Sequence, residues 1–324
     1  MKKQDLRIVF MGTPDFAVPT LKAIIDNGYN VVGVITAPDK EAGRGKKINM
    51  SAIKKFAIEH KLKILQPHKL KDENFIVDLR NLKANLQVVV AFRMLPEIVW
   101  AMPALGTFNL HASLLPQYRG AAPINFAIIN GETTTGLTTF FLDKEIDTGR
   151  IIFQEKIDIS KNDDAGTLHD RMMEKGSDIV LKTINSISNN EVTSHEQHKF
   201  TDEYNTLKIA PKIKKDFCRI NWNNTPITIY NFVRGLSPYP ASFSVLKSDR
   251  EIQHSIKVFK ASIISSSPST EVCGKIITDE KTYLNVIAKT GIISILELQL
   301  SGKKRMSITD FLRGFQNINS FHFE

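Results

Sequence analysis

An asparagine and a histidine two residues apart are the side chains of this sequence whose types and spacing first suggest chemistry. They are Asn109 and His111, at the end of an apolar run that predicts a strand. Because successive side chains of a strand point to opposite faces, these two share one face, and Phe108 and Leu110 share the other. An amide donor and an imidazole placed in this way can converge on one small polar group. An isolated pair of this kind is, however, more often a turn cap beside a hydrogen-bonded histidine.

A turn rich in carboxylates follows at residues 142–149, between two expected strands. Its acidic residues are Asp143, Glu145 and Asp147. Any of the three could orient or charge the imidazole, and the turn itself favours none of them. A hairpin turn with solvated carboxylates would have the same sequence pattern.

The residues above lie within or after predicted strands, which are apolar runs separated by helix patterns. Strand signals occur at 8–11, 31–36, 88–91, 107–111, 137–142 and 151–157. Such strands predict a Rossmann-like, mostly parallel sheet with helices on both faces. Ligands bind these sheets beyond the carboxyl ends of the strands, which is where His111 lies. The first strand is followed by G-T-P-D at 12–15 rather than G-x-G-x-x-G, so binding of a nicotinamide dinucleotide has no support.

The pattern changes after a polar segment at 190–206, which we predict to be a linker. Beyond it, a helix pattern near 225–235 precedes short strands at regular spacing. This order predicts a small OB-like β-barrel. We therefore expect an α/β domain over 1–189, the linker over 190–206 and a barrel domain over 207–324.

Positive charge is concentrated in the expected barrel domain. The net charge of the chain is +9, and residues 207–324 carry 17 Lys and Arg against 9 Asp and Glu. This asymmetry favours a polyanionic partner, either nucleic acid or another anionic surface, although a basic surface kept for solubility has the same composition. An apolar fraction of 42% and a charged fraction of 24% are ordinary globular values and exclude disordered, collagenous and coiled-coil classes.

Neither a signal peptide nor a membrane span is indicated. The apolar run at 8–11 is too short for a signal peptide, and the uncharged stretch 98–118 contains prolines that a lipid-facing helix tolerates poorly. Cys218 and Cys273 are too few for a cysteine-rich metal site and lie in no nucleophile motif. Two cysteines in a chain of this length also indicate a reducing compartment. We expect a cytoplasmic protein with no metal and no obligate protein partner.

Several motifs together resemble the folate-dependent formyltransferases. The runs H-A-S-L-L-P at 111–116 and R-G-A-A-P-I at 119–124 are typical of that superfamily. Further motifs resemble its tRNA-directed branch, and they lie at 10–17, 38–47, 146–149, 302–306 and 310–314. The resemblance implies transfer of a formyl group from 10-formyltetrahydrofolate to the α-amine of methionine on initiator tRNA. It also implies that residues 1–189 form the catalytic domain.

The resemblance further implies which residues form the site. It implies a catalytic set of Asn109, His111 and Asp147, and so selects Asp147 from the three carboxylates of the turn. N–H groups of the first two would stabilise negative charge on the formyl oxygen. Asp147 would fix the tautomer of His111 and favour its protonated form. The residues implied to bind folate are Ser113, Leu114, Leu115, Pro116, Phe92, Arg93 and Leu95. The stretch 91–96 is one residue shorter than is usual in the family, which places Arg93 near the folate pocket.

The basic clusters gain a role from the same resemblance. The implied tRNA contacts are Arg44, Lys46, Lys47, Lys208, Lys212, Lys214, Lys215, Lys303, Lys304 and Arg305. Two alternatives remain. One is a folate-dependent formyltransferase for a small amine, such as glycinamide ribonucleotide or an amino sugar, and the basic C-terminal third argues against it. The other is a tRNA-binding protein with an inactive formyltransferase-like domain, and the joint presence of the three implied catalytic residues argues against it.

Overall fold

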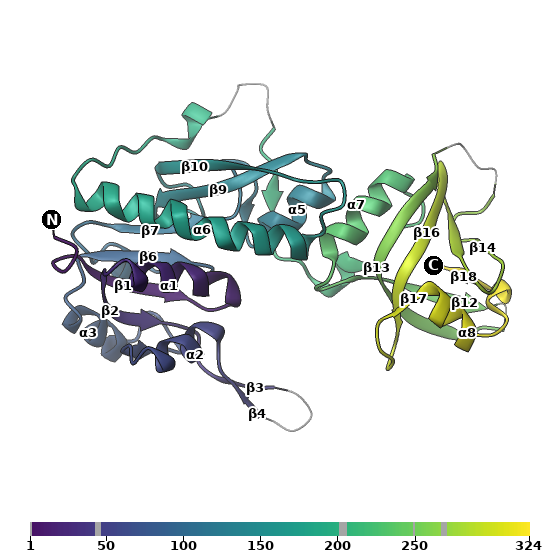
Figure 1. Ribbon diagram of the computed structural model, residues 1–324, viewed down its shortest axis with the longest axis horizontal. Coiled ribbons are helices and arrows are strands. Elements are labelled where there is room, and N and C mark those ends of the chain that lie inside the picture. The colour runs from purple at the N-terminus through teal and green to yellow at the C-terminus, as the bar shows by residue number, and fades with distance from the viewer. Residues whose placement is uncertain (1, 43–46, 201–205, 249, 267–270) are drawn as a thin grey trace. The chain divides into compact units, whose positions relative to one another are not determined.

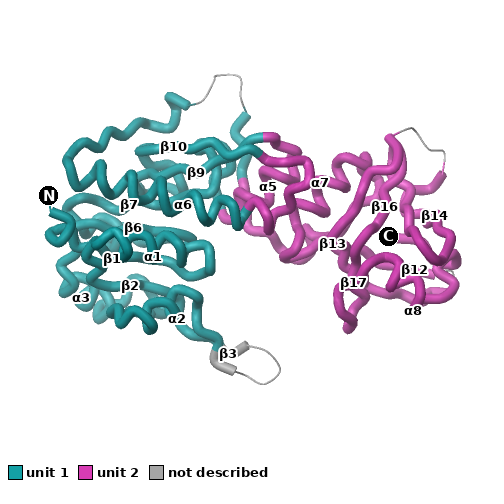
Figure 2. The backbone as a smooth tube through the Cα atoms, in the orientation of Figure 1, with its two compact units in different colours: residues 1–120, 134–158, 169–209 teal, residues 121–133, 159–168, 210–324 magenta. Residues whose placement is uncertain are grey.

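The structure is a computed structural model that describes residues 2–42, 47–200, 206–248, 250–266 and 271–324. These residues form two compact units (Figure 2). The first comprises residues 1–120, 134–158 and 169–209, and the second comprises residues 121–133, 159–168 and 210–324. Two internal segments of the chain therefore belong to the second unit. The contiguous domain boundaries expected from the sequence stay a prediction.

The first unit is built around a seven-stranded sheet (Figure 1). Its strand order is β10 (Ile151–Asp158), β9 (Thr134–Phe141), β7 (Thr107–His111), β6 (Leu86–Val90), β1 (Arg7–Gly12), β2 (Asn30–Ile35) and β5 (Ile64–Leu65). The strands from β7 to β5 are parallel, whereas β9 and β10 are antiparallel to their neighbours. The expected Rossmann-like, mostly parallel sheet is confirmed.

Helices cover both faces of this sheet. On one face, α3 (Glu73–Asn81) contributes to an apolar cluster with side chains of β1 and β6. On the other, α6 (Ala165–Ser188) passes close to β7, because a Cβ added at Gly176 would lie 2.8 Å from Leu110. The other helices of the unit are α1 (Val18–Asp26), α2 (Ala52–Glu59) and α4 (Glu97–Trp100). Its remaining strands are β3 (Lys40–Ala42), β4 (Lys47–Asn49) and β8 (Arg119–Gly120).

The second unit is centred on an antiparallel sheet that nearly closes on itself. Its strand order is β14 (Ile276–Thr278), β15 (Leu284–Ala288), β16 (Gly291–Leu300), β13 (Gln253–Ser265), β12 (Ser242–Ser248) and β18 (Phe321–Phe323), with β17 (Met306–Ser307) beside β16. Lys275, just before β14, forms a bridge with His322 of β18, so the two ends of this order approach each other. The expected OB-like barrel is confirmed.

A helix leads into the barrel, as the sequence predicted. This helix is α7 (Pro226–Leu236), and the Thr225 hydroxyl accepts a hydrogen bond from the backbone N–H of Thr228 at 3.4 Å to cap it. α5 (Pro123–Ile129) packs on α7, and the Asn125 amide donates to the carbonyl oxygen of Gly235 at 2.7 Å. This packing is why residues 121–133 belong to the second unit. The unit also contains α8 (Ile308–Gly314) and two 3₁₀ helices, Lys215–Cys218 and Ile318–Ser320, and β11 (Ile209–Ala210) lies at its boundary with the first unit.

None of the helices in the described ranges has the length and apolarity that crossing a bilayer requires.

Candidate active site

Strand β7 presents the two side chains from which the sequence argument began. Asn109 pairs with Val89 of β6 and Phe140 of β9, which places it at the carboxyl end of a central strand. The alternation of the strand puts His111 on the same face, as predicted. Asn109 is half-buried, and its side-chain amide makes no hydrogen bond to any residue that the structure describes. This amide is therefore available to donate to a bound group.

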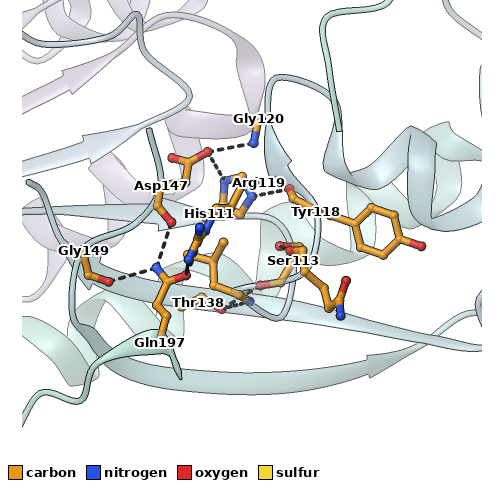
Figure 3. A network of polar contacts seen from close by, with 11 residues as sticks. His111, Ser113, Tyr118, Arg119, Gly120, Thr138, Asp147, Gly149 and Gln197 are labelled. Carbon is orange, nitrogen blue, oxygen red and sulfur yellow. Dashed lines mark hydrogen bonds and ion pairs between the residues drawn. The ribbon is translucent and has the colours of Figure 1, made fainter. Parts of the chain in front are cut away.

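His111 is buried, and its imidazole faces an oxygen atom on each side (Figure 3). Nε2 lies 2.9 Å from the carbonyl oxygen of Tyr118, and because a carbonyl can only accept, Nε2 is the donor. Nδ1 lies 3.7 Å from Oδ2 of Asp147. Both ring nitrogens thus face protein oxygens, whereas the resemblance implied an imidazole N–H that points at substrate. Among the described residues of the set, Asn109 carries the N–H groups without a protein partner.

Asp147 is the carboxylate of the 142–149 turn that faces His111. Its Oδ2 also accepts a hydrogen bond from the backbone N–H of Gly120 at 2.9 Å, and its side chain is 16% exposed. Asp143 instead closes the turn, since its Oδ1 accepts from the hydroxyl of Thr148 at 2.6 Å and from the backbone N–H of Glu145 at 3.1 Å. Glu145 is exposed. The geometry therefore separates three carboxylates that the sequence pattern alone left equivalent.

The backbone around Asp147 has a tightly constrained shape. Asp147 adopts a left-handed conformation with φ of 55°, which is uncommon for a residue other than glycine. Two residues later, a Cβ on Gly149 would lie 1.7 Å from the carbonyl oxygen of Phe141, so only glycine fits there. The close approach of Gly149 brings the turn back against the end of β9, and this holds Asp147 over β7.

A buried threonine holds the turn that follows β7. The hydroxyl of Thr138, on β9, donates to the carbonyl oxygen of Ser113 at 2.7 Å and accepts from the backbone N–H of Leu115 at 3.1 Å. The Gln154 amide donates to the same hydroxyl at 3.0 Å and to the carbonyl oxygen of Leu115 at 2.8 Å. These bonds fix the backbone of residues 113–115 in one conformation.

The side chains implied to bind folate in this turn lie mostly inside the protein. Ser113, Leu115 and Pro116 are buried, and the Ser113 hydroxyl donates to the carbonyl oxygen of Gln117 at 2.6 Å. Leu114 is half-buried and packs over β9, because a Cβ on Gly136 would lie 2.4 Å from its Cδ2 atom. A ligand at this turn would thus meet its backbone and Leu114 before the other three side chains.

The segment after β6 offers a different surface for a folate. The backbone N–H and C=O groups of residues 92–95 make no hydrogen bond to the residues that the structure describes. Leu95 is buried, whereas Phe92 is half-buried. A pteridine ring carries amide-like donors and acceptors along one edge, so unpaired backbone groups beside an apolar side chain fit it chemically. The donor set of this segment therefore suits the co-substrate that the resemblance implied.

The guanidinium of Arg93 is engaged by backbone groups of another loop. NH1 donates to the carbonyl oxygen of His68 at 2.9 Å, NH2 donates to that of Pro67, and the group lies 5.6 Å from the centre of the Phe92 ring. Burial lowers the pKa of Arg93 from its usual value. The guanidinium therefore links the 92–95 segment to the loop at 67–68 through hydrogen bonds.

Three of the implied tRNA contacts, Arg44, Lys46 and Lys47, lie in the region of a hairpin that the sequence did not predict. Strands β3 and β4 pair, and Arg44 and Lys46 fall between them in the sequence, outside the described residues. Lys47 begins β4, and its side chain is likewise not described. At the base of the hairpin, hydrogen bonds from Lys54 and then Gln66 lower the pKa of Asp39.

The other implied tRNA contacts are exposed, and Arg305 differs from the lysines in its contacts with other side chains. Exposed lysines are found at Lys208, Lys212, Lys214, Lys215, Lys303 and Lys304. Arg305 is exposed too, but it pairs with Glu297 at 2.5 Å and lies 4.6 Å from the centre of the Phe259 ring. Its charge is therefore already partly compensated within the barrel.

Sequence reasoning missed three side chains that hold the site, namely Thr138, Gln154 and Gln197. Thr138 and Gln154 lie in strands that the sequence indicates through their apolar residues only. Gln197 lies in the polar segment predicted to be a linker. No spacing rule singles them out, because their hydrogen-bond partners, backbone groups and side chains alike, are distant in sequence. Within the described ranges, no group of three or more His, Cys, Asp or Glu side chains could hold a metal.

Comparison with known proteins assigns the chain to a family. A model for formyl transferase matches residues 6–184, and a model for the formyl transferase C-terminal domain matches residues 212–316. The chain is 53% identical to the methionyl-tRNA formyltransferase of Parabacteroides distasonis over 322 residues, which is 99% of each protein. It is 54% identical to that of Bacteroides thetaiotaomicron over 316 residues, which is 98% of each.

A solved structure shows a similar fold at lower sequence identity. The sugar 3N-formyl transferase WlaRD, determined in the presence of dTDP and 5-N-formyl-THF, superimposes with a TM-score of 0.63 at 24% identity. The match covers 92% of this chain and 99% of that one. The two family models and the relatives more than 50% identical over nearly the whole chain show that the chain belongs to the formyl transferase family and, within it, to the methionyl-tRNA formyltransferases.

Proposed function

We propose that this enzyme transfers the formyl group of 10-formyltetrahydrofolate to the α-amine of methionine on initiator tRNA, in the cytoplasm, before translation begins. The observation that carries the proposal is the side-chain amide of Asn109, which is unpartnered among the described residues and lies on the same strand face as His111. The nearly full-length identity to methionyl-tRNA formyltransferases supports the same substrates.

The residues of the site have separate tasks in this reaction. The co-substrate supplies the formyl carbon as an amide-like acyl group, and the neutral α-amine attacks that carbon. Asn109 donates N–H to the formyl oxygen, where negative charge grows as the amine bonds. His111, facing Asp147 at 3.7 Å, places positive charge beside that oxygen when it is protonated. The bond between the formyl carbon and N10 then breaks, and the proton lost by the amine accompanies the departing N10.

Placement of the two substrates is the other part of the catalysis. The 92–95 segment and the turn at 113–116 would hold the folate, and the basic residues of the hairpin and the barrel would hold the tRNA. Good alignment of two reactants can contribute about 7–11 kcal/mol to lowering a barrier, so these surfaces contribute to rate as well as to binding. No covalent enzyme intermediate is needed, since the amine attacks the acyl donor directly.

A formyl-transfer assay tests the proposal against its alternatives. Wild-type enzyme with formyl-labelled 10-formyltetrahydrofolate is given methionyl initiator tRNA, uncharged initiator tRNA, glycinamide ribonucleotide or a nucleotide-linked amino sugar in parallel. We expect label on the methionyl-tRNA alone. Label on a small amine at a comparable rate would establish the first alternative instead. Binding of tRNA with no label on any acceptor would establish the second alternative, a tRNA-binding protein with an inactive formyltransferase-like domain.

A further inference from the structure

We propose that Gln197 is a positioning residue for this reaction, which holds Asp147 where it can face His111. The inference rests on the proposed function, because it concerns the same site. Gln197 lies at the start of a short 3₁₀ helix, Gln197–Phe200, in the segment that the sequence predicted to be a linker. Its side chain is nevertheless buried, with 4% of the residue exposed.

The amide of Gln197 is fully used in hydrogen bonds (Figure 3). Nε2 donates to the carbonyl oxygens of Asp147 at 2.8 Å and Gly149 at 2.9 Å. Oε1 accepts from Nε and NH2 of Arg119, at 3.0 Å and 2.6 Å. In the flipped orientation, the amide NH2 group would face the guanidinium of Arg119 and the amide oxygen would face two carbonyl oxygens. Neither pair can hydrogen-bond, so the partners determine the orientation of the amide.

These bonds reach both segments that hold the carboxylate of Asp147. Two of them fasten the backbone of residues 147–149, where Asp147 has its left-handed conformation. The other two hold Arg119, whose neighbour Gly120 donates its N–H to Oδ2 of Asp147 at 2.9 Å. Gln197 therefore ties the carboxylate's own backbone to the strand that orients it. Among the described residues, no hydrogen bond joins Gln197 to His111, so its role is to position Asp147.

The segment that carries Gln197 has its own attachments. His195 and Ile151 exchange backbone hydrogen bonds, both at 2.8 Å. Arg150 donates to the hydroxyl of Ser194 at 3.0 Å and to its carbonyl oxygen at 2.7 Å. Changing the Gln197 side chain therefore leaves the segment anchored, so an effect on rate can be separated from detachment of the chain.

The test uses the near-isosteric variant Gln197→Met and the neighbouring control Glu196→Gln. Glu196 is exposed and pairs with Arg150 at 3.2 Å, and its side chain makes no hydrogen bond to the 147–149 backbone among the described residues. We expect Gln197→Met to lower the single-turnover rate by about 10- to 100-fold, since a shift of an ångström in a catalytic group can cost about 100-fold. KM for methionyl-tRNA and for the folate should change less than about threefold, because a positioning residue that is 4% exposed is not expected to bind either substrate. Glu196→Gln should stay close to wild type.

A double-mutant cycle shows whether Gln197 acts through Asp147. In an Asp147→Asn background, Gln197→Met should lower the rate by less than about threefold, and in both single variants the pH–rate profile should shift in the same direction. If the double variant loses rate by the product of the two single-variant factors, the positioning role is overturned. An unchanged rate in Gln197→Met would overturn it too. If Gln197→Met fails to fold, Gln197→Glu takes its place, because it keeps the Arg119 contact and loses the amide donor. A wild-type enzyme that formylates no tRNA would instead overturn the proposed function, so the two failures are distinguishable.

Discussion

Oδ2 of Asp147 lies 3.7 Å from Nδ1 of His111, while the same oxygen accepts the backbone N–H of Gly120 at 2.9 Å. The carboxylate is thus held by a neutral donor on one side and turned to the imidazole on the other. Oδ2 therefore connects the turn at 142–149 both to the backbone of β8 and to the end of β7.

Removing either N–H donor of β7 should lower the rate of formyl transfer and leave tRNA binding nearly unchanged. We expect Asn109→Ala and His111→Ala each to lower kcat by about 100- to 1,000-fold, the usual cost of losing a group that stabilises an oxyanion. Single-turnover rates and tRNA binding are measured side by side. Rates within about threefold of wild type for both variants would refute the assignment.

Asp147→Asn should reduce activity more than Asp143→Asn or Glu145→Gln. The amide would still reach the N–H of Gly120 but would remove the negative charge opposite His111. Asp143 closes the turn instead, and Glu145 is exposed. The three variants are compared by their pH–rate profiles, and Asp143→Asn as the most damaging would show that the role was assigned to the wrong carboxylate.

Thr138→Val should destabilise the protein and weaken folate binding. Valine has nearly the same shape but leaves the N–H of Leu115 and the carbonyl oxygen of Ser113 without their buried partner. A buried unsatisfied group costs about 1–3 kcal/mol, so urea unfolding should show a loss of that size together with a higher KM for the folate. Thr134→Val, at an exposed position of the same strand, is the matched control. Equal stability of the two variants would contradict the role of Thr138.

The lysine cluster at the start of the barrel domain should supply general affinity for tRNA. Replacing Lys212, Lys214 and Lys215 together by alanine should weaken tRNA binding at low salt, since all three are exposed. Each lost phosphate contact should also flatten the slope of log affinity against log salt by about one unit. Lys63→Ala with Lys71→Ala removes two exposed charges of the first unit and should leave the slope unchanged. Normal binding by the triple variant would refute this assignment.

Arg44→Ala should lower turnover of bound tRNA more than it lowers affinity. Arg44 lies between two glycines in the sequence that separates β3 from β4, so its expected task is placement of the acceptor end. Misalignment of the attacking amine lowers the rate even at saturating tRNA. Arg44→Lys, which keeps the charge, is compared in the same assay. Unchanged turnover at saturating tRNA in Arg44→Ala would leave the loop as one more phosphate contact.

The sequence by itself determined the fold class and the shared strand face of Asn109 and His111. Apolar runs of strand length between helix patterns predicted the parallel sheet, and β7 spans the predicted residues 107–111. Alternation along a strand is a local property of the backbone, so the shared face of Asn109 and His111 followed from their spacing alone. The choice of Asp147 came from the family motif, because the charge pattern of the turn favoured no carboxylate.

Tertiary structure decided what distant segments do to these residues. Only the folded chain shows that Asp147 faces His111, that Thr138 holds the 113–115 turn, and that Gln197 fastens Asp147. Polar composition predicted a linker around Gln197, because composition reports average solvent preference and not the partners of one amide. Hydrogen bonds of buried side chains to backbone groups depend on packing between segments far apart in sequence. No periodicity records that packing, so these contacts became visible only when the sheet brought the segments together.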